Sequence, residues 1–158
     1  MRVTRSVFTL LAAIILPVAG AEKEERSVFR LHVVHDQFTA DSIPKKLFGK
    51  REMYNLAVEP KFADEDVESA RVETSGEQSR IVIKLKPGSA ERLRRLSEQW
   101  RGKRVGLVLM NKLMAAPVIE GAISNGELSV PMPNAREAEL VAQMLRAVAK
   151  REEKEKRD

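Results

Sequence analysis

The sequence has 158 residues, which suits one domain with a single core, and its 43% apolar, 32% charged and 4% aromatic residues predict an aliphatic core under a heavily charged surface. The absence of cysteine excludes thiol catalysis, cysteine-based metal sites and disulfides. The net charge of +5 is a small surplus of 28 basic over 23 acidic residues, and one Trp and one Tyr are present, so we do not expect nucleic acid as a partner.

The first 21 residues differ from the rest of the chain. Arginines at positions 2 and 5 precede an apolar run over 7–18, and small residues follow at 19–21, which is typical of a secretory signal peptide. We predict cleavage after Ala21, a mature chain without an integral membrane segment, and a location in the periplasm or cell envelope. An uncleaved anchor or a buried first helix is the alternative, but the run is shorter than the roughly 20 residues that cross a bilayer.

After a flexible polar lead-in over 22–27, residues 28–35 alternate in a pattern that predicts a strand. Residues 36–59 mix isolated apolar side chains with Pro44, Gly49 and charges, so we expect a long loop or a loop with a short helix. Such a loop is either a mobile binding element or an irregular connection. The acidic cluster at 64–66 predicts a helix start capped by Asp64 rather than a calcium site, because the spaced oxygen ligands of such a site are missing.

The middle of the chain predicts a hairpin and then an amphipathic helix. Strands at 70–74 and 81–86 flank a turn-forming stretch with a glycine. Ser89 is a candidate N-cap for a helix that runs to about Trp100. Its apolar residues recur at helical spacing and form one stripe: Ala90, Leu93, Leu96 and Trp100.

Residues 104–110 form a strongly apolar run that predicts a central strand. Asn111 tolerates the left-handed backbone of a tight turn, so residues 112–119 are expected to return as the second strand of a hairpin. Pro117 within that return strand marks an edge or a bulge, where no ladder donor is missed.

A short strand is expected at 127–130, followed by a helix that Asn134 and Glu137 begin as a variant of the capping box. This helix should end near Lys150, where a charged, disordered tail over 150–158 begins. Together these elements predict a single α+β domain over 28–149. We expect two layers: a mainly antiparallel sheet of about five to six strands, with two amphipathic helices packed on one face.

The order of motifs resembles the SecD family of bacterial protein-export factors. In that family a Gly-Lys-Arg segment leads into a strand, a tight turn and a segment ending in Ala-Pro-Val-Ile, which is similar to Gly102–Arg104 and Ala116–Ile119. Residues 66–72 and 137–147 also look like family segments, so the resemblance covers 65–147. It implies the head portion of the first periplasmic domain of SecD. No membrane helices follow Ala147 in this sequence, so we expect a standalone module without the family's proton-driven motor activity.

Candidates for catalysis are few. His32 and His35 are the only histidines, and their spacing on a strand places them on opposite faces, which disfavours joint metal ligation. No nucleophile elbow, phosphate loop or zinc-protease motif is present. We therefore predict no catalytic, cofactor-binding or metal-binding residue, and no cofactor.

The preferred hypothesis is a non-enzymatic binding or accessory module that engages extended polypeptide or an envelope protein. An unpaired strand edge can accept a further strand, and the candidate edge consists of Ala115, Ala116, Pro117, Val118 and Ile119. The alternatives are a small envelope hydrolase with a site in 36–59, and an envelope-structure role. The sequence does not indicate the oligomeric state.

Overall fold

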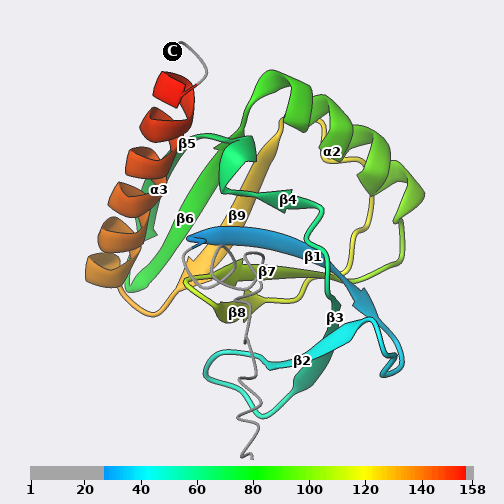
Figure 1. The fold of residues 1–158 in the computed structure, drawn as a ribbon. Helices are drawn as coiled ribbons and strands as arrows, with labels where there is room; N and C mark the ends of the chain where they lie inside the picture. Colours follow the sequence, from blue (N-terminus) through cyan, green and yellow to red (C-terminus); the bar gives the residue numbers. More distant parts are fainter. Residues whose placement is uncertain (1–26, 156–158) are drawn as a thin grey trace, which may run out of the picture.

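The computed structural model describes residues 27–155, so the predicted signal peptide, most of the lead-in and the last three residues lie outside the described residues. Within this range the chain forms strands, two helices and one 3-10 turn (Figure 1). The elements are β1 (Phe29–His35), β2 (Ser42–Lys46), β3 (Met53–Ala57), β4 (Phe62–Ala63), η1 (Asp64–Asp66), β5 (Val67–Ser75), β6 (Gln78–Leu85), α2 (Pro87–Gln99), β7 (Val105–Leu109), β8 (Lys112–Ala115), β9 (Glu127–Met132) and α3 (Ala135–Glu155).

The strands form two sheets. One has the order β2-β3-β1-β7-β8, with β4 also paired to β1, and the other has the order β5-β6-β9. Every pairing within these sheets is antiparallel. The α+β class with a mainly antiparallel arrangement and two helices is thus confirmed, but nine described strands divide between two sheets instead of forming one.

The larger sheet curls until its two ends meet. Leu47, just after β2, bridges to Leu113 on β8, and the Phe48 amide donates a hydrogen bond to the Leu113 carbonyl at 2.8 Å. The curl encloses a small apolar cluster made by Val34, Leu47, Tyr54, Leu56, Val108 and Leu113.

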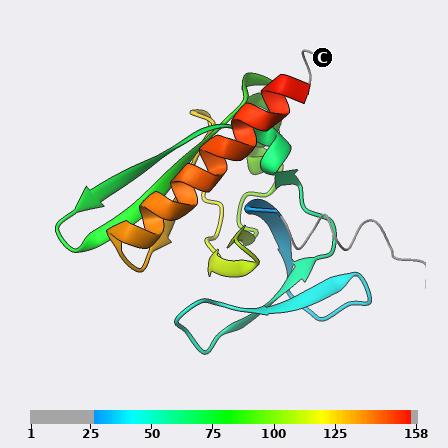
Figure 2. The same ribbon diagram turned by 60° about the vertical axis from the view of Figure 1, so that its left-hand side comes forward.

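Residues 36–59, expected to be a loop, contain the hairpin β2–β3, which projects away from both helices (Figures 1 and 2). Strand β2 carries Pro44 and two lysines and lacks apolar alternation, so its pattern gave no strand signal. Its strand conformation comes from pairing with β3 and from the contact between Leu47 and Leu113. Pro44 lies on the outer strand of the sheet, which is where proline is tolerated.

The three-stranded sheet is covered on one face by α3 (Figure 2). Ile81 and Ile83 of β6 are fully buried, and Val130 and Leu128 of β9 lie beside them in register. Helix α3 buries a stripe of apolar side chains: Ala138, Val141, Ala142, Leu145 and Ala149. Both sheets and both helices contribute to one main core, which also contains Leu93 of α2 and Trp100.

The helix ends agree with the sequence in part. Asn134 begins α3 as predicted: its side-chain oxygen accepts from the Glu137 amide at 2.9 Å, and its side-chain nitrogen donates to the Glu137 carboxylate at 3.0 Å. Helix α3 continues to Glu155, beyond the end predicted near Lys150. Helix α2 begins at Pro87, so Ser89 lies inside the first turn and its predicted capping role is wrong.

The Ser89 hydroxyl instead donates to Asp66 at 2.6 Å. Asp66 is buried and also accepts from the Ala63 amide at 3.0 Å and from Arg92 at 2.8 Å. Asp64 accepts from the amides of Val28 and Phe29, which fixes the start of β1. The acidic cluster therefore joins β1, η1 and α2, and within residues 27–155 no group of acidic or histidine side chains could hold a metal ion.

Candidate functional site

The candidate edge begins at the hairpin β7–β8. Met110 and Asn111 both have positive φ, 46° and 64°, as a two-residue hairpin turn requires, which confirms the turn predicted at Asn111. All five residues of β7 are buried, so this strand is central, also as predicted. Strand β8 pairs with β7 through Leu113, and the register shifts before Ala115, which leaves Met114 as the extra residue of a bulge.

Strand β8 ends at Ala115, yet the next residues continue along β7. Arg104 bridges to Val118, the Val105 amide donates to the Pro117 carbonyl at 3.0 Å, and the Ile119 amide donates to the Lys103 carbonyl at 2.8 Å. In an antiparallel pair the N–H and C=O of one residue point to the same side. The nitrogen of Pro117 therefore faces β7, where the reciprocal bond to Val105 cannot form.

This corrects the expectation that Pro117 lies where no ladder donor is missed. The bulge lies at Met114, three residues earlier, and Pro117 interrupts the ladder, because it accepts one hydrogen bond from β7 but cannot donate the second. The guanidinium of Arg104 supports the interrupted segment by donating to the Ala116 carbonyl.

The backbone of Val118 points away from β7, because its neighbours Pro117 and Ile119 both bond toward it. Within the described residues, neither the N–H nor the C=O of Val118 makes a backbone hydrogen bond. Val118 is 43% exposed, whereas Ala116 and Ile119 are buried and hold the segment on the core. The five predicted edge residues thus lie together, and Val118 offers the outward donor and acceptor.

A groove of about 360 Å³ runs beside this segment. One wall is the stretch 117–123, the floor includes Val105 and Leu107 of β7, and the other wall is the start of β9. The lining is mostly apolar, and Glu120 contributes a carboxylate to it, while the carboxylate of Glu127 is already paired with Arg71. The groove therefore suits a segment with apolar side chains and basic neighbours.

Strand β9 forms the outer strand of its sheet, so it presents a second edge to the groove. The Gly126 carbonyl accepts from the Leu85 amide, which places the backbone groups of alternate residues, Leu128 and Val130, toward β6. Ser129 and Pro131 therefore face outward. Pro131 has no N–H, so the outward donor of β9 at the groove is Ser129.

Helix α2 fixes the wall of the groove. Ser97 is fully buried, and its hydroxyl accepts from the Ile123 amide at 2.8 Å while it donates to the Arg94 carbonyl at 2.9 Å. Gly126 has φ +66°, and a β-carbon there would approach the Ala90 β-carbon to 2.5 Å. The start of α2 therefore packs directly on the turn that leads into β9. Sequence reasoning did not predict these two contacts, since a lone Ser on a helix and a glycine in a turn are common.

Comparison with known proteins places this arrangement in a family. Residues 41–149 match the family model described as SecDF, P1 head subdomain, which covers more than half of the chain. The chain belongs to the SecDF P1 head subdomain family. This confirms the resemblance seen in the sequence and associates the domain with protein export.

Two solved structures share the fold of this P1 head. One, described as "Structure and function of a membrane component SecDF that enhances protein export", has a TM-score of 0.62 at 20% identity and covers 83% of this chain and 70% of its own. The other, "Crystal structure of SecDF in Super-membrane-facing form", has a TM-score of 0.64 at 19% identity. That match covers 82% of this chain but 21% of the SecDF chain. A search of curated proteins gave no match.

No helix among residues 27–155 of this P1 head has the length and apolar character that crossing a bilayer requires.

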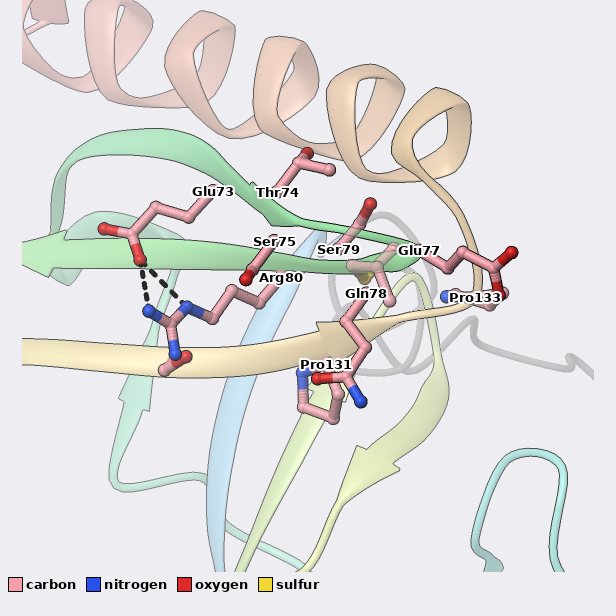
Figure 3. Close-up of a pocket in the computed structure, with 11 residues that line it drawn as sticks. Glu73, Thr74, Ser75, Glu77, Gln78, Ser79, Arg80, Pro131 and Pro133 are labelled. Atoms are coloured by element: carbon pink, nitrogen blue, oxygen red, sulfur yellow. Dashed lines mark hydrogen bonds and ion pairs between the residues drawn. The ribbon is translucent and has the colours of Figure 1, made fainter.

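A second hollow of this P1 head lies over the β5–β6 hairpin and the end of β9 (Figure 3). It is an open, polar surface on which Arg80 lies 2.7 Å from Glu73. Beside it, Arg71 bridges Glu127 on β9 at 2.7 Å and Glu73 at 3.1 Å. The hydrogen bond from Arg71 lowers the pKa of Glu127, and the hydrogen bond from Arg80 lowers the pKa of Glu73. These ion pairs connect β5, β6 and β9 across the outer face of the sheet.

The histidines do not form a site in this P1 head. His32 is buried, and its Nδ1 lies 2.8 Å from the Ala57 carbonyl. His35 lines a shallow hollow with Asp36, Tyr54 and Arg104. Within the described residues no hydrogen bond connects His35 to a carboxylate, and Arg104 already donates to Ala116. The hollow thus joins the 36–59 segment to a histidine but lacks a base–nucleophile pair, and the hydrolase alternative receives no support.

Proposed function

We propose that this domain is an exported, non-enzymatic accessory module of protein export that binds extended polypeptide along Ala115–Ile119. The observation that carries the proposal is the outward N–H and C=O of Val118 beside an apolar groove. Backbone groups at a sheet edge recognise any extended chain, while the groove selects for apolar side chains. A partner that must accept many sequences needs this combination.

The proposal places backbone hydrogen bonds on both sides of a docked chain. Val118 lies on one wall of the groove and Ser129 on the other, and both present backbone groups that their own sheets do not use. Glu120 on the rim favours basic residues in the bound segment. Family membership also supports a role in protein export, because one matched solved structure is described as a membrane component that enhances protein export.

A binding titration with variants of Val118 tests this function. Val118→Pro removes the outward N–H without removing a hydrogen bond inside the fold, and Val118→Thr is the matched control that keeps it. We expect Val118→Pro to weaken the binding of a short peptide of alternating apolar and basic residues by about tenfold, the equivalent of one lost backbone hydrogen bond. Val118→Thr should bind like the unchanged chain. Equal affinity of all three proteins, or no saturable binding at all, would contradict the proposal.

The proposed envelope location rests on the N-terminal pattern and on the family. If the signal peptide is cleaved during export, the chain recovered from the cell envelope should begin at Glu22, because the small residues of the cleavage site end at position 21. N-terminal sequencing of the recovered protein measures this. Recovery of a chain that still carries residues 7–18 would instead support the uncleaved anchor.

A further inference from the structure

The tip of the β2–β3 hairpin, which projects away from both helices, contacts the turn of the β7–β8 hairpin (Figures 1 and 2). The β2–β3 turn meets the β7–β8 turn through the hydrogen bond from Phe48 to Leu113 and through Lys45, whose ammonium donates to the Asn111 carbonyl at 3.0 Å. The ammonium of Lys112 lies 5.1 Å from the centre of the Phe48 ring. These contacts hold the two tips together, and we call residues 45–53 and 110–112 the double tip.

The charge of the double tip is strongly one-sided. The hollow between the turns, about 820 Å³, is lined by five cationic side chains and one carboxylate, Glu52; the cations are Lys45, Lys46, Lys50, Arg51 and Lys112. Within residues 27–155, no ion pair involves Lys46, Lys50, Arg51 or Lys112. On the three-stranded sheet, by contrast, Arg71, Arg80 and Lys84 each pair with a glutamate.

Apolar side chains stand among these cations. Phe48 is 41% exposed, Met110 is 43% exposed, and Met53, which lies opposite Lys46 in the hairpin, is 58% exposed. Exposed aromatic and aliphatic side chains interspersed with lysine and arginine match the boundary between lipid headgroups and acyl chains. An acidic protein surface would pair with the cations, but its carboxylates would make no favourable contact with these apolar side chains.

The route of the chain supplies an independent argument. The Met110 amide donates to the Val28 carbonyl at 2.9 Å, and Phe29 pairs with Leu109, so the chain enters the fold at the double tip. The apolar run over 7–18 lies only nine residues before position 27. Nine residues span at most about 30 Å, so before the predicted cleavage after Ala21, while that run is in a bilayer, the double tip is held near the membrane surface.

We propose that the double tip docks on the anionic surface of a membrane, with Phe48, Met53 and Met110 entering the headgroup layer and the four cations Lys46, Lys50, Arg51 and Lys112 contacting lipid phosphates. This surface is separate from the polypeptide-binding edge at Ala115–Ile119. Docking would therefore orient the domain without occupying the groove.

The test uses the absence of cysteine, which allows one label per chain. A polarity-sensitive fluorophore is attached at Met110→Cys, and the matched control carries it at Leu140→Cys, a 55% exposed position on α3. Full-length chains are mixed with vesicles of phosphatidylcholine alone or of phosphatidylcholine and phosphatidylglycerol. We expect a blue shift at position 110, not at position 140, that requires phosphatidylglycerol and disappears in high salt.

Charge removal gives the second readout. In the Met110→Cys background, Lys46→Gln, Lys50→Gln, Arg51→Gln and Lys112→Gln together should weaken binding to anionic vesicles by more than about a hundredfold, since each cation contributes about fivefold. The pair Lys50→Gln and Arg51→Gln, both at exposed positions, is the milder variant if the fourfold change impairs folding. The same variants are also measured in chains that begin at Glu22, the predicted mature start, so that residues 7–18 do not contribute to binding.

Three results would overturn the proposal: an equal shift at position 140, a shift that ignores phosphatidylglycerol, or undiminished binding by the variants. A blue shift at 110 produced by soluble polyglutamate but not by vesicles would assign the double tip to an acidic protein instead. Peptide affinity at the Val118 edge is measured on the same variants and should not change, which separates this proposal from the proposed function.

Discussion

At the scale of single residues, the interior of the curled sheet depends on Gly106. This residue lies on β7, and a β-carbon there would approach Leu56 Cδ2 to 2.6 Å and Leu113 Cδ1 to 3.1 Å. Leu56 and Leu113 fill the small cluster that closes the β2–β3 hairpin over β8. Glycine at this position therefore makes room for the side chains that hold the hairpin in place.

We expect Gly106→Ala to lower the free energy of unfolding by about 1–3 kcal/mol, because the added methyl group overpacks a closed cluster. Gly121→Ala is the control, since a β-carbon at Gly121 meets no atom within 4 Å. Denaturant titration of both variants measures the difference. If Gly106→Ala unfolded at the same denaturant concentration as Gly121→Ala, the proposed packing of Leu56 would be wrong.

Residue-level predictions from sequence succeeded where a motif is local. The Asn111 turn and the Asn134 cap depend on backbone groups within a few residues, and both are confirmed. The Ser89 cap failed because a distant residue, Asp66, takes the hydroxyl, and Pro87 had already begun the helix. A contact across 23 positions leaves no trace in the spacing of neighbouring residues.

At the scale of elements, the outer face of the three-stranded sheet is held by ion pairs between strands. Arg71 on β5 reaches diagonally across β6 to Glu127 on β9, and Val82 of β6, which is paired with Arg71 in register, is 5% exposed although it faces outward. The hydrogen bond from Arg71 is the main cause of the lowered pKa of Glu127. Because folding lowers the pKa of Glu127, its ionised carboxylate stabilises the folded state at pH values above the ordinary pKa of 4.5. This stabilisation is lost as the pH falls through the lower pKa of the folded state.

Arg71→Gln should therefore raise the pKa of Glu127 back toward 4.5, because the charged donor is gone. A carbon-13 NMR titration of the glutamate carboxyls measures this directly. Arg94→Gln serves as the control, since Arg94 pairs with Glu91 and Glu98 on α2 and should leave Glu127 unchanged. An unchanged Glu127 titration in Arg71→Gln would show that the cross-strand pair does not persist in solution.

Element predictions were reliable for long periodic segments. The apolar stripes of α2 and α3 and the buried strands β6 and β7 agree with the structure. The hairpin β2–β3 was missed because Ser42–Lys46 has neither alternation nor a run of β-branched residues. The last turn of α3 was missed because a charged sequence forms helix without any apolar period.

At the scale of the whole molecule, the exposed sheet edges carry protection against unwanted pairing. Pro44 lies on β2, Pro131 faces outward on β9, and Arg146 of α3 donates to the Ala70 carbonyl on β5 at 3.1 Å. In contrast to these protected edges, the outward N–H and C=O of Val118 make no backbone hydrogen bond within the described residues. The sequence indicated this segment through Pro117, although for a reason that the structure corrects.

The groove itself could not be predicted from the sequence. One wall is the stretch 117–123, which follows β8, and the other is the start of β9. Ser97 of α2 bonds to the Ile123 amide, and Gly126 lets the start of α2 pack closely on the turn before β9. The double tip was equally hidden, since its cations come from residues 45–51 and from Lys112, which pattern reading treated as separate segments. The family resemblance was accessible because it depends on the order of short motifs rather than on contacts between them.

The most direct test of the central claim is the hydrogen exchange rate of the Val118 amide, followed by NMR with and without an extended peptide of alternating apolar and basic residues. We predict fast exchange in the free protein and at least about tenfold slower exchange when the peptide is bound, because the peptide supplies the missing acceptor. The Val105 amide, which already donates to Pro117, should be slow in both states. Saturating peptide that leaves the Val118 rate unchanged would contradict the account.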